Sequence, residues 1–404
     1  MLSLFLLSTA QSIYSQNLPS LLLNRNINST FSIIAFDKEN QEWGIAVATN
    51  NIYVGNSTIY IQAGLGAFSV IAETEPAYAI NGFEQLKKGT TIQQAIDYTR
   101  QSDSESYNRQ VSGIDSHGNV YAFTGPALKY WNGTSTHKTG KSYVVMGNQL
   151  ADSVLSNMAK TFEQSKGSLA ERLLKSLVAG QDAGGQITGK QSAALVVKGS
   201  NNEWFNQVDL RVDNSKTPFE DLQKLLNYHY GRIRINQAIN AFKMMNKKRG
   251  AQLLKEAEVL TDGWNGIYSK IAMAYILSGD EGKALAVIQK ALIENPQWKE
   301  NLPAFYCLTN HPEMNQLIHA DSFSLKNWDA AIDFMTEINR NKQSIDLAKR
   351  VLQKYPTSSF TFYLIGKAYY QDGDKESAKK NLNTALQYDK DNAEAKKLLQ
   401  GLYK

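Results

Sequence analysis

The sequence predicts an α+β layered sandwich followed by an all-α region of helical repeats. From residue 30 to about 230, short β-rich runs alternate with two blocks of helical pattern. From about residue 235 the strand pattern stops, and two 34-residue segments place small residues at the same offsets. With 404 residues, 42% of them hydrophobic and 20% charged, the chain has a globular composition and room for two or three domains.

The first predicted element is a β-hairpin within residues 30–55. Residues 31–36 and 43–48 are two almost wholly apolar runs, and residues 37–42 form a polar connection between them. Runs that are apolar at successive positions predict strands buried on both faces. We therefore expect this hairpin to be the structural anchor of the first domain.

The remaining elements of the first domain follow in chain order. Thr91 is a candidate N-cap, and Gly89 and Gly167 mark helix ends. Strands and helices in this order predict a sheet sandwich covered by helices on its faces. The predicted strands are 58–62, 67–72, 110–114, 120–124, 143–146, 192–198 and 208–212; the predicted helices are 76–86, 91–98 and a pair between 150 and 180.

The N-terminus has the pattern of a secretory signal peptide at residues 1–16, an apolar core followed by small residues. Residues 17–29 would then form a leader, and the protein would be exported to the periplasm or the extracellular space. A buried N-terminal helix is the alternative. The apolar core is too short for a stable membrane-spanning helix. Cys307 is the single cysteine, so no intrachain disulfide is possible.

Composition and spacing argue against several classes of partner and cofactor. A net charge of +5 with scattered Lys and Arg gives little support for nucleic acid as a partner. The five histidines lack local metal-ligand spacing, although a site assembled from distant parts stays open. Residues 184–190 almost form a phosphate-binding loop, but Gln191 replaces the Ser or Thr and a predicted strand follows. We expect no metal and no cofactor.

Small hydroxyls stand where the leader meets the first strand. If the chain is cut before Thr30, the hydroxyl and a free α-amine share one residue, which is a known way to activate a nucleophile. Further along, Gly147-Asn148 is interpreted as an abrupt turn between a strand and a helix. Asn148 would either face a carbonyl oxygen there or simply cap the helix.

Several ordered blocks of sequence between residues 29 and 230 resemble the domain-of-unknown-function family numbered 1028, DUF1028. That family is grouped with the N-terminal nucleophile hydrolases, so the resemblance implies a four-layer αββα sandwich and hydrolysis of an amide bond. The blocks are TFSIIAFD from Thr30, WGIAVA from Trp43, AGLGA from Ala63, RQVSG from Arg109, Gly147-Asn148, AGQDAGG from Ala179, KQSAAL from Lys190 and DLRVD from Asp209.

The resemblance also implies roles for individual residues. Thr30 would be the nucleophile and its own α-amine the base, with Ser32 as the alternative hydroxyl. Backbone N–H groups near Gly64 and Gly66, helped by Asn148, would hold the oxyanion. Orientation of the site or polar substrate contacts would fall to Asp37, Gln191, Arg211 and Asp213, with ion pairing the preferred role of the last two. The sequence departs from proteasome-like relatives because it has no Lys between Lys38 and Lys87.

The two 34-residue segments, 265–298 and 359–392, resemble tetratricopeptide repeats. Their small residues allow two helices of a hairpin to approach closely. Such arrays, here predicted over 235–404, offer a concave face to a peptide or another protein. The alternative is a helical appendage that only stabilises the chain.

Two functions therefore remain open from the sequence. The first is an exported amide hydrolase, acting on peptides or small N-acyl compounds, whose repeats recruit a protein partner. The second is a non-catalytic binding or assembly protein in which both domains are interaction modules.

Overall fold

The computed structural model describes residues 29–203 and 206–402. The predicted signal peptide and the leader up to residue 28 lie outside these ranges. The chain divides into two compact units, Met1–Leu226 and Asn227–Lys404. The division falls inside α6 (Pro218–Lys243), so the interval 230–235, expected to separate the two domains, is part of a continuous helix.

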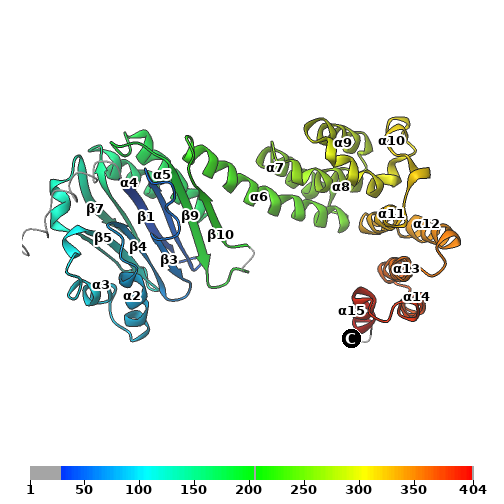
Figure 1. Ribbon diagram of the computed structural model, residues 1–404, viewed down its shortest axis with the longest axis horizontal. Helices are drawn as coiled ribbons and strands as arrows, with labels where there is room; N and C mark the ends of the chain where they lie inside the picture. Colours follow the sequence, from blue (N-terminus) through cyan, green and yellow to red (C-terminus); the bar gives the residue numbers. More distant parts are fainter. Residues whose placement is uncertain (1–28, 204–205, 403–404) are drawn as a thin grey trace, which may run out of the picture. The chain divides into compact units, whose positions relative to one another are not determined.

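The first unit is a four-layer αββα sandwich, as predicted (Figure 1). Helices α4 (Val154–Gln164) and α5 (Leu169–Asp182) cover the six-stranded sheet, and α2 (Ala77–Lys87) and α3 (Ile92–Arg100) cover the four-stranded one. The larger sheet has the order β10 (Val208–Val212), β9 (Ser192–Gly199), β2 (Glu42–Thr49), β1 (Thr30–Asp37), β8 (Tyr143–Leu150), β7 (Thr134–Gly140). The smaller sheet has the order β3 (Ile59–Gln62), β4 (Gly66–Ala72), β5 (Arg109–Asp115), β6 (Val120–Thr124).

The predicted hairpin is β1 paired with β2, and it lies at the centre of the larger sheet. The antiparallel register runs from Thr30 opposite Thr49 to Asp37 opposite Glu42. On its other side β1 pairs with β8, which places Asn148 opposite Thr30. Seven of the eight residues in each hairpin strand are buried, because one face meets the second sheet and the other meets helices.

Alternation along β1 sorts its side chains between the two faces. Ile34 and Phe36 belong to a core cluster with Ala67 and Ile114 of the smaller sheet, so the even-numbered residues point between the sheets. Phe31 points to the helical side, where its ring lies beside Gly180 of α5. Thr30 and Ser32 therefore face the interior of the sandwich.

The predicted turn at Gly147-Asn148 is wrong, because β8 continues through both residues to Leu150 and α4 begins only at Val154. Gly147 is required by close packing instead. A Cβ atom there would lie 2.8 Å from the Cβ of Phe31. Strand β7 was not predicted at all, because its sequence, TSTHKTG, is polar and suits the edge of the sheet.

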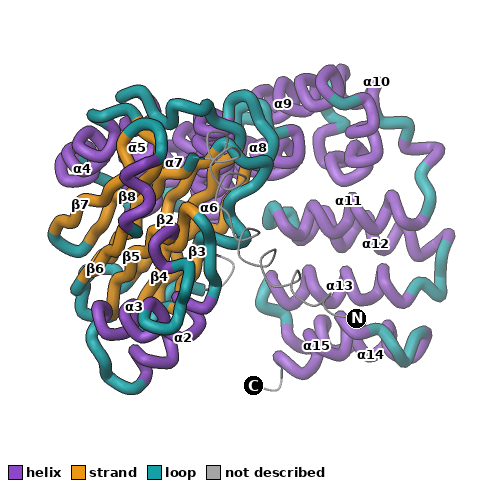
Figure 2. Tube along the Cα trace, turned by 60° about the vertical axis from the view of Figure 1, so that its left-hand side comes forward, coloured by secondary structure: helices purple, strands orange, loops and turns teal. Residues whose placement is uncertain are grey.

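The second unit is all-helical, as predicted. Figure 2 shows α11, α12, α13 and α14 stacked as successive antiparallel helices. Gly279 and Gly373 end the first helices of two pairs in the left-handed region, at φ 92° and 85°. The helices after α6 are α7 (Lys247–Leu260), α8 (Tyr268–Ser278), α9 (Glu281–Glu294), α10 (Pro312–Leu317), α11 (Leu325–Glu337), α12 (Asn341–Lys354), α13 (Ser359–Gln371), α14 (Lys375–Tyr388) and α15 (Ala393–Gly401), with 3-10 segments η5 (Pro296–Leu308) and η6 (Ala320–Ser322) around α10.

Within residues 29–203 and 206–402, no helix combines the length and apolarity needed to cross a membrane. The same residues contain no cluster of three or more His, Cys, Asp or Glu side chains arranged to hold a metal ion.

Candidate functional site

A row of four buried polar side chains crosses one end of the larger sheet. Ser192, Thr49, Thr30 and Asn148 occupy matching positions on β9, β2, β1 and β8. Their exposed fractions are 0, 1, 8 and 0%. Burying polar groups costs free energy unless they are hydrogen-bonded, so such a row is informative.

The backbone nitrogen of Thr30 is bound by an amide whose orientation is fixed by its neighbours. Gln110 on β5 donates its side-chain N–H groups to the carbonyls of Gly147 (2.9 Å) and Thr136 (3.2 Å). Its Oε1 must then accept from Asn148 Nδ2, at 3.0 Å. This leaves Asn148 Oδ1 to accept from the Thr30 N–H, at 3.1 Å. Asn148 therefore serves the nitrogen of Thr30 rather than an oxyanion, which corrects its predicted role.

The Thr30 hydroxyl is the donor in its contact with Thr49. Thr49 Oγ1 donates its only hydrogen to the carbonyl oxygen of Ser29, at 2.7 Å. The 3.0 Å contact between the Thr30 and Thr49 hydroxyls can then be a hydrogen bond only if Thr30 donates. In the uncut chain, the Thr30 oxygen thus keeps its lone pairs free of Thr49.

The Ser29 carbonyl accepts three hydrogen bonds. The donors are the Thr49 hydroxyl at 2.7 Å, the backbone N–H of Asn50 at 3.2 Å and the side-chain amide of Gln186. Several donors converging on one carbonyl oxygen are what stabilises the oxyanion of an acyl-transfer reaction. This carbonyl belongs to the peptide bond between Ser29 and Thr30, the bond that the predicted mechanism requires to be cut.

A glycine-rich loop, residues 183–191, forms another wall of this site. Gln186 bridges to Leu150 at the end of β8, and Thr188 Oγ1 lies 2.5 Å from Ser29 Oγ. Gly184, Gly185 and Gly189 have φ of 109°, 55° and 104°, which side chains strongly disfavour. The glycines that resemble a phosphate-binding loop in the sequence thus form a loop that binds Ser29 through hydrogen bonds. Strand β9 follows this loop.

Polar groups continue inward from Thr30 between the sheets. Ser32 is fully buried, and its hydroxyl lies 3.1 Å from that of Ser69 on β4. Gln110 also contacts Thr124 at 3.2 Å, and Thr124 in turn contacts His137 Nδ1 at 2.8 Å. Burial lowers the pKa of His137, which favours the neutral ring. Ser32 is therefore unreachable for a substrate, which makes Thr30 the better placed of the two predicted nucleophiles.

Three predicted site residues lie at the opposite end of the sandwich. Asp37 ends β1, seven residues from Thr30 or about 23 Å along the strand, and it accepts from the N–H groups of Glu39 and Asn40 in the turn. Gly66 pairs with Asp115, whose carbonyl accepts from the Trp43 indole at that same end, and Gly64 is two residues before it. Gly64, Gly66 and Asp37 are therefore not part of the Thr30 site.

The predicted substrate-binding residues differ in their placement. The Gln191 N–H donates to the carbonyl of Thr49, and its side chain donates to Asn214, so Gln191 borders the site. Arg211 and Asp213 are exposed on and just after the edge strand β10. Arg211 forms an ion pair with Asp209 at 2.9 Å, which agrees with the structural role preferred for it.

Sequence reasoning missed four residues of the site: Thr49, Gln110, Gln186 and Thr188. Gln110 carries the clearest local signal, because a Gln within an apolar run that is predicted to be a buried strand requires a polar partner. The other three stand in loops or at a strand end, where sequence alone does not show which distant group they contact.

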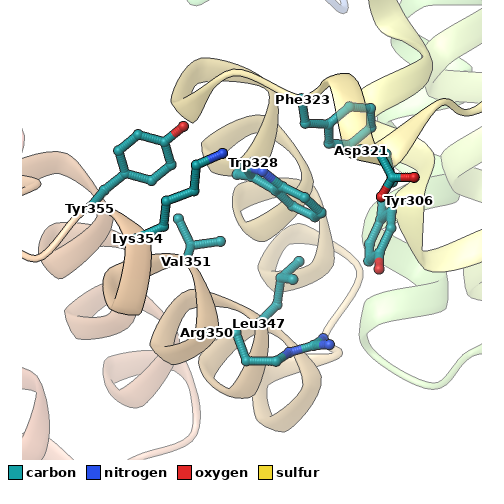
Figure 3. Close-up of a pocket in the computed structure, with 10 residues that line it drawn as sticks. Tyr306, Asp321, Phe323, Trp328, Leu347, Arg350, Val351, Lys354 and Tyr355 are labelled. Atoms are coloured by element: carbon teal, nitrogen blue, oxygen red, sulfur yellow. The ribbon is translucent and has the colours of Figure 1, made fainter.

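The second unit contains a separate cavity of about 280 Å³ between η6, α11 and α12 (Figure 3). Aromatic rings of Tyr306, Phe323, Trp328 and Tyr355 surround it, and Arg350 and Lys354 of α12 lie at its rim. Asp321 also lines the cavity.

Comparisons with known proteins match the two units separately. Residues 30–222 match the model of a family of unknown function, DUF1028, and residues 361–392 match that of a tetratricopeptide repeat. A DUF1028 protein of known structure from Silicibacter pomeroyi is 29% identical, covers 49% of this chain and 84% of its own, and gives a TM-score of 0.45.

Two further solved structures cover 43% of the chain. MamA from Desulfovibrio magneticus RS-1 is 16% identical over 82% of its own chain, with a TM-score of 0.20. The P58(IPK) tetratricopeptide domain is 14% identical over 55% of its own, with a TM-score of 0.22. No curated protein matches. The chain thus combines a DUF1028 domain at residues 30–222 with a helical region that carries a tetratricopeptide repeat.

Proposed function

We propose that the DUF1028 domain is an amide hydrolase whose nucleophile is Thr30, active once the Ser29–Thr30 peptide bond is cut. One observation carries the proposal. The carbonyl of that bond is held by three donors while the hydroxyl of the next residue lies beside one of them. A second amide carbonyl placed at the same position would meet the same donors and the same hydroxyl.

The reaction proceeds in two balanced steps. The Thr30 hydroxyl attacks the substrate carbonyl carbon, and its proton passes to the α-amine of Thr30. The tetrahedral oxyanion is held by Thr49, Asn50 and Gln186. The C–N bond then breaks, the leaving amine takes the proton, and an ester on Thr30 remains. Water hydrolyses that ester, which releases the acid and restores the hydroxyl.

Asn148 and Gln110 position the base. Asn148 Oδ1 accepts one hydrogen of the Thr30 nitrogen, so the lone pair of a free amine is turned away from Asn148. Gln110 fixes which end of the Asn148 amide faces Thr30. Both are positioning residues, since neither touches the reacting carbonyl.

The proposed reaction does not use the Lys that proteasome-like relatives place close to the nucleophile. Every side chain that contacts Ser29 or Thr30 through a hydrogen bond given above is neutral: Thr49, Gln186, Thr188 and Asn148.

The helical unit supplies an interaction tail for protein partners. For the location of the protein we retain the export expected from the N-terminal sequence, which would place the hydrolase in the periplasm or outside the cell. A non-catalytic assembly protein remains the competing function, and the following experiment separates the two.

The test is the chain that begins at Thr30, cut from an N-terminal fusion directly before Thr30 while the chain is unfolded, and then refolded. Intact mass confirms the new terminus. We expect it to hydrolyse members of a panel of acyl p-nitroanilides, and Thr30→Ala to abolish the activity. Comparable melting temperatures would show that the variant is folded. Equal rates for the two chains, or no hydrolysis by either, would favour the assembly function.

A further inference from the structure

The loop at residues 183–191 holds the side chain of Ser29 as well as its carbonyl. Thr188 Oγ1 lies 2.5 Å from Ser29 Oγ, and Gln186 Nε2 donates to the same oxygen at 3.0 Å. Ser29 is fully buried. The residue before the nucleophile therefore occupies a pocket that recognises a hydroxyl group.

The pocket is supported by contacts that do not involve Ser29. The carbonyl of Thr188 accepts from Asn50 Nδ2 at 2.9 Å, and the N–H of Ile187 donates to Gln149 O at 3.0 Å. A Cβ at Gly184 would lie 2.8 Å from Ala151, so the loop is packed closely against the end of β8. We expect its shape to persist after Ser29 departs.

The position of the attacking oxygen then decides which acyl groups fit. A substrate carbonyl must reach both Thr30 Oγ1 and the donors of Thr49, Asn50 and Gln186, which is where the Ser29 carbonyl lies. The substituent on its α-carbon consequently falls where the Ser29 side chain lies. A hydroxymethyl group at this position forms the same hydrogen bonds with Thr188 and Gln186 as the Ser29 side chain.

Gln186 offers one further group. Its residue is 5% exposed, and its Oε1 has no hydrogen-bond partner among the described residues. A buried acceptor without a partner costs free energy until a donor arrives. The N–H of Ser29 does not bind this oxygen, so only a substrate donor placed elsewhere in the pocket would satisfy it.

We propose that the preferred substrates are seryl amides, including peptides cleaved after serine. This rests on the proposed function, because it describes the acyl side of the same reaction. The C–N bond on the carboxyl side of serine breaks, a seryl ester forms on Thr30 Oγ1, the amine leaves with the proton, and water releases the seryl acid.

The experiment compares N-acetyl-seryl and N-acetyl-alanyl p-nitroanilide with the full chain from Thr30. The alanyl compound lacks only the hydroxyl. Two neutral hydrogen bonds predict a kcat/KM about tenfold higher for the seryl substrate. Thr188→Val removes one of these two hydrogen bonds and should lower the ratio to about threefold, and Thr188→Ser should retain it. Thr139→Val on the exposed edge strand β7 is the matched control and should leave the ratio as in the parent chain.

The outcomes separate this inference from the proposed function. Hydrolysis that is lost in Thr30→Ala but shows no preference for serine overturns the seryl pocket and leaves the hydrolase standing. A seryl preference that is undiminished in Thr188→Val also overturns it. No Thr30-dependent hydrolysis of any anilide removes the proposed function, and the seryl pocket with it.

Discussion

The two ends of strand β1 are built on opposite principles. At the Asp37 end, the rings of Phe36 and Trp43 pack at an angle of 32° with centroids 4.6 Å apart, and a turn on the surface closes the hairpin. At the Thr30 end, side chains of Thr49, Asn148 and Gln110 are buried yet polar. Burying polar side chains costs free energy that burying apolar side chains does not. Polar groups retained at that cost are expected to serve chemistry.

The largest expected effect is a loss of activity on substitution at the Thr30 end of β1. Thr30→Ala should lower kcat/KM of the chain cut before residue 30 by at least about a thousandfold, because the nucleophile is lost. Thr30→Ser keeps a hydroxyl and should retain a measurable part of the activity. Steady-state kinetics on an anilide substrate gives both values. Activity in the alanine variant would disprove the assignment of Thr30.

A substitution at the Asp37 end of β1 should lower the free energy of unfolding instead. Trp43 is fully buried and donates from its indole to Asp115 O at 3.3 Å. Trp43→Ala should cost about 3–5 kcal/mol of unfolding free energy, through a large cavity. Urea denaturation followed by circular dichroism measures it. A cost below about 1 kcal/mol would show that this end is not a tightly packed core.

Asn148→Leu tests the positioning of the Thr30 nitrogen. The substitution keeps the size but removes the acceptor, so we expect kcat to fall about a hundredfold through misorientation of the amine. It also leaves Gln110 Oε1 without its donor, at a cost of about 1–3 kcal/mol. Asn157→Leu on the exposed face of α4 is the control for added surface leucine. Unchanged kcat in Asn148→Leu would contradict the positioning role.

Asp37→Ala tests whether the Asp37 end of β1 affects stability without affecting activity. It removes the acceptor of two turn N–H groups, which should cost about 1 kcal/mol. The kcat/KM should match the parent chain, because Asp37 lies at the far end of the strand. A loss of activity larger than the loss of folded protein would return Asp37 to the site.

The smallest effect concerns pH. Burial lowers the pKa of His137 below its ordinary value of 6.5, so the folded domain resists a proton that the unfolded chain accepts. Stability contributed by the neutral ring is present above pH 6.5 and declines as the pH falls below it. Urea denaturation at pH 7.5 and 5.5 should show a smaller difference for His137→Asn than for the parent chain. An equal difference would assign the pH response to other groups, such as His229, whose pKa is also lowered by burial.

The comparison also explains how far sequence alone could lead. The hairpin was predictable because consecutive apolar residues reveal burial on both faces, and the start of α3 was predictable because Thr91 forms a local capping box. Gly147-Asn148 was misread as a turn because a glycine needed for close approach to Phe31 has the same local appearance as one needed for a turn.

The site was less predictable for a related reason. Thr30 was identified through its place at the start of the strand. Gln110 and Gln186, 80 and 156 residues further along the chain, contact its neighbours Asn148 and Ser29 instead. Gly64 and Gly66 were assigned to the site because the sequence does not reveal which end of a sandwich a turn will occupy. Register between distant strands decides that question.

The complete burial of Ser29 determines whether the chain can be cut before Thr30 after it has folded. A separate protease must draw several residues of extended backbone into its own cleft, and it cannot do so at a bond enclosed by Thr49, Asn50 and Gln186. Cutting at Thr30 must therefore precede folding or be performed by the folded domain on itself. Purified uncut chain, unfolded in urea and refolded alone, distinguishes the two: a new N-terminus at Thr30 makes folding itself the trigger of activation.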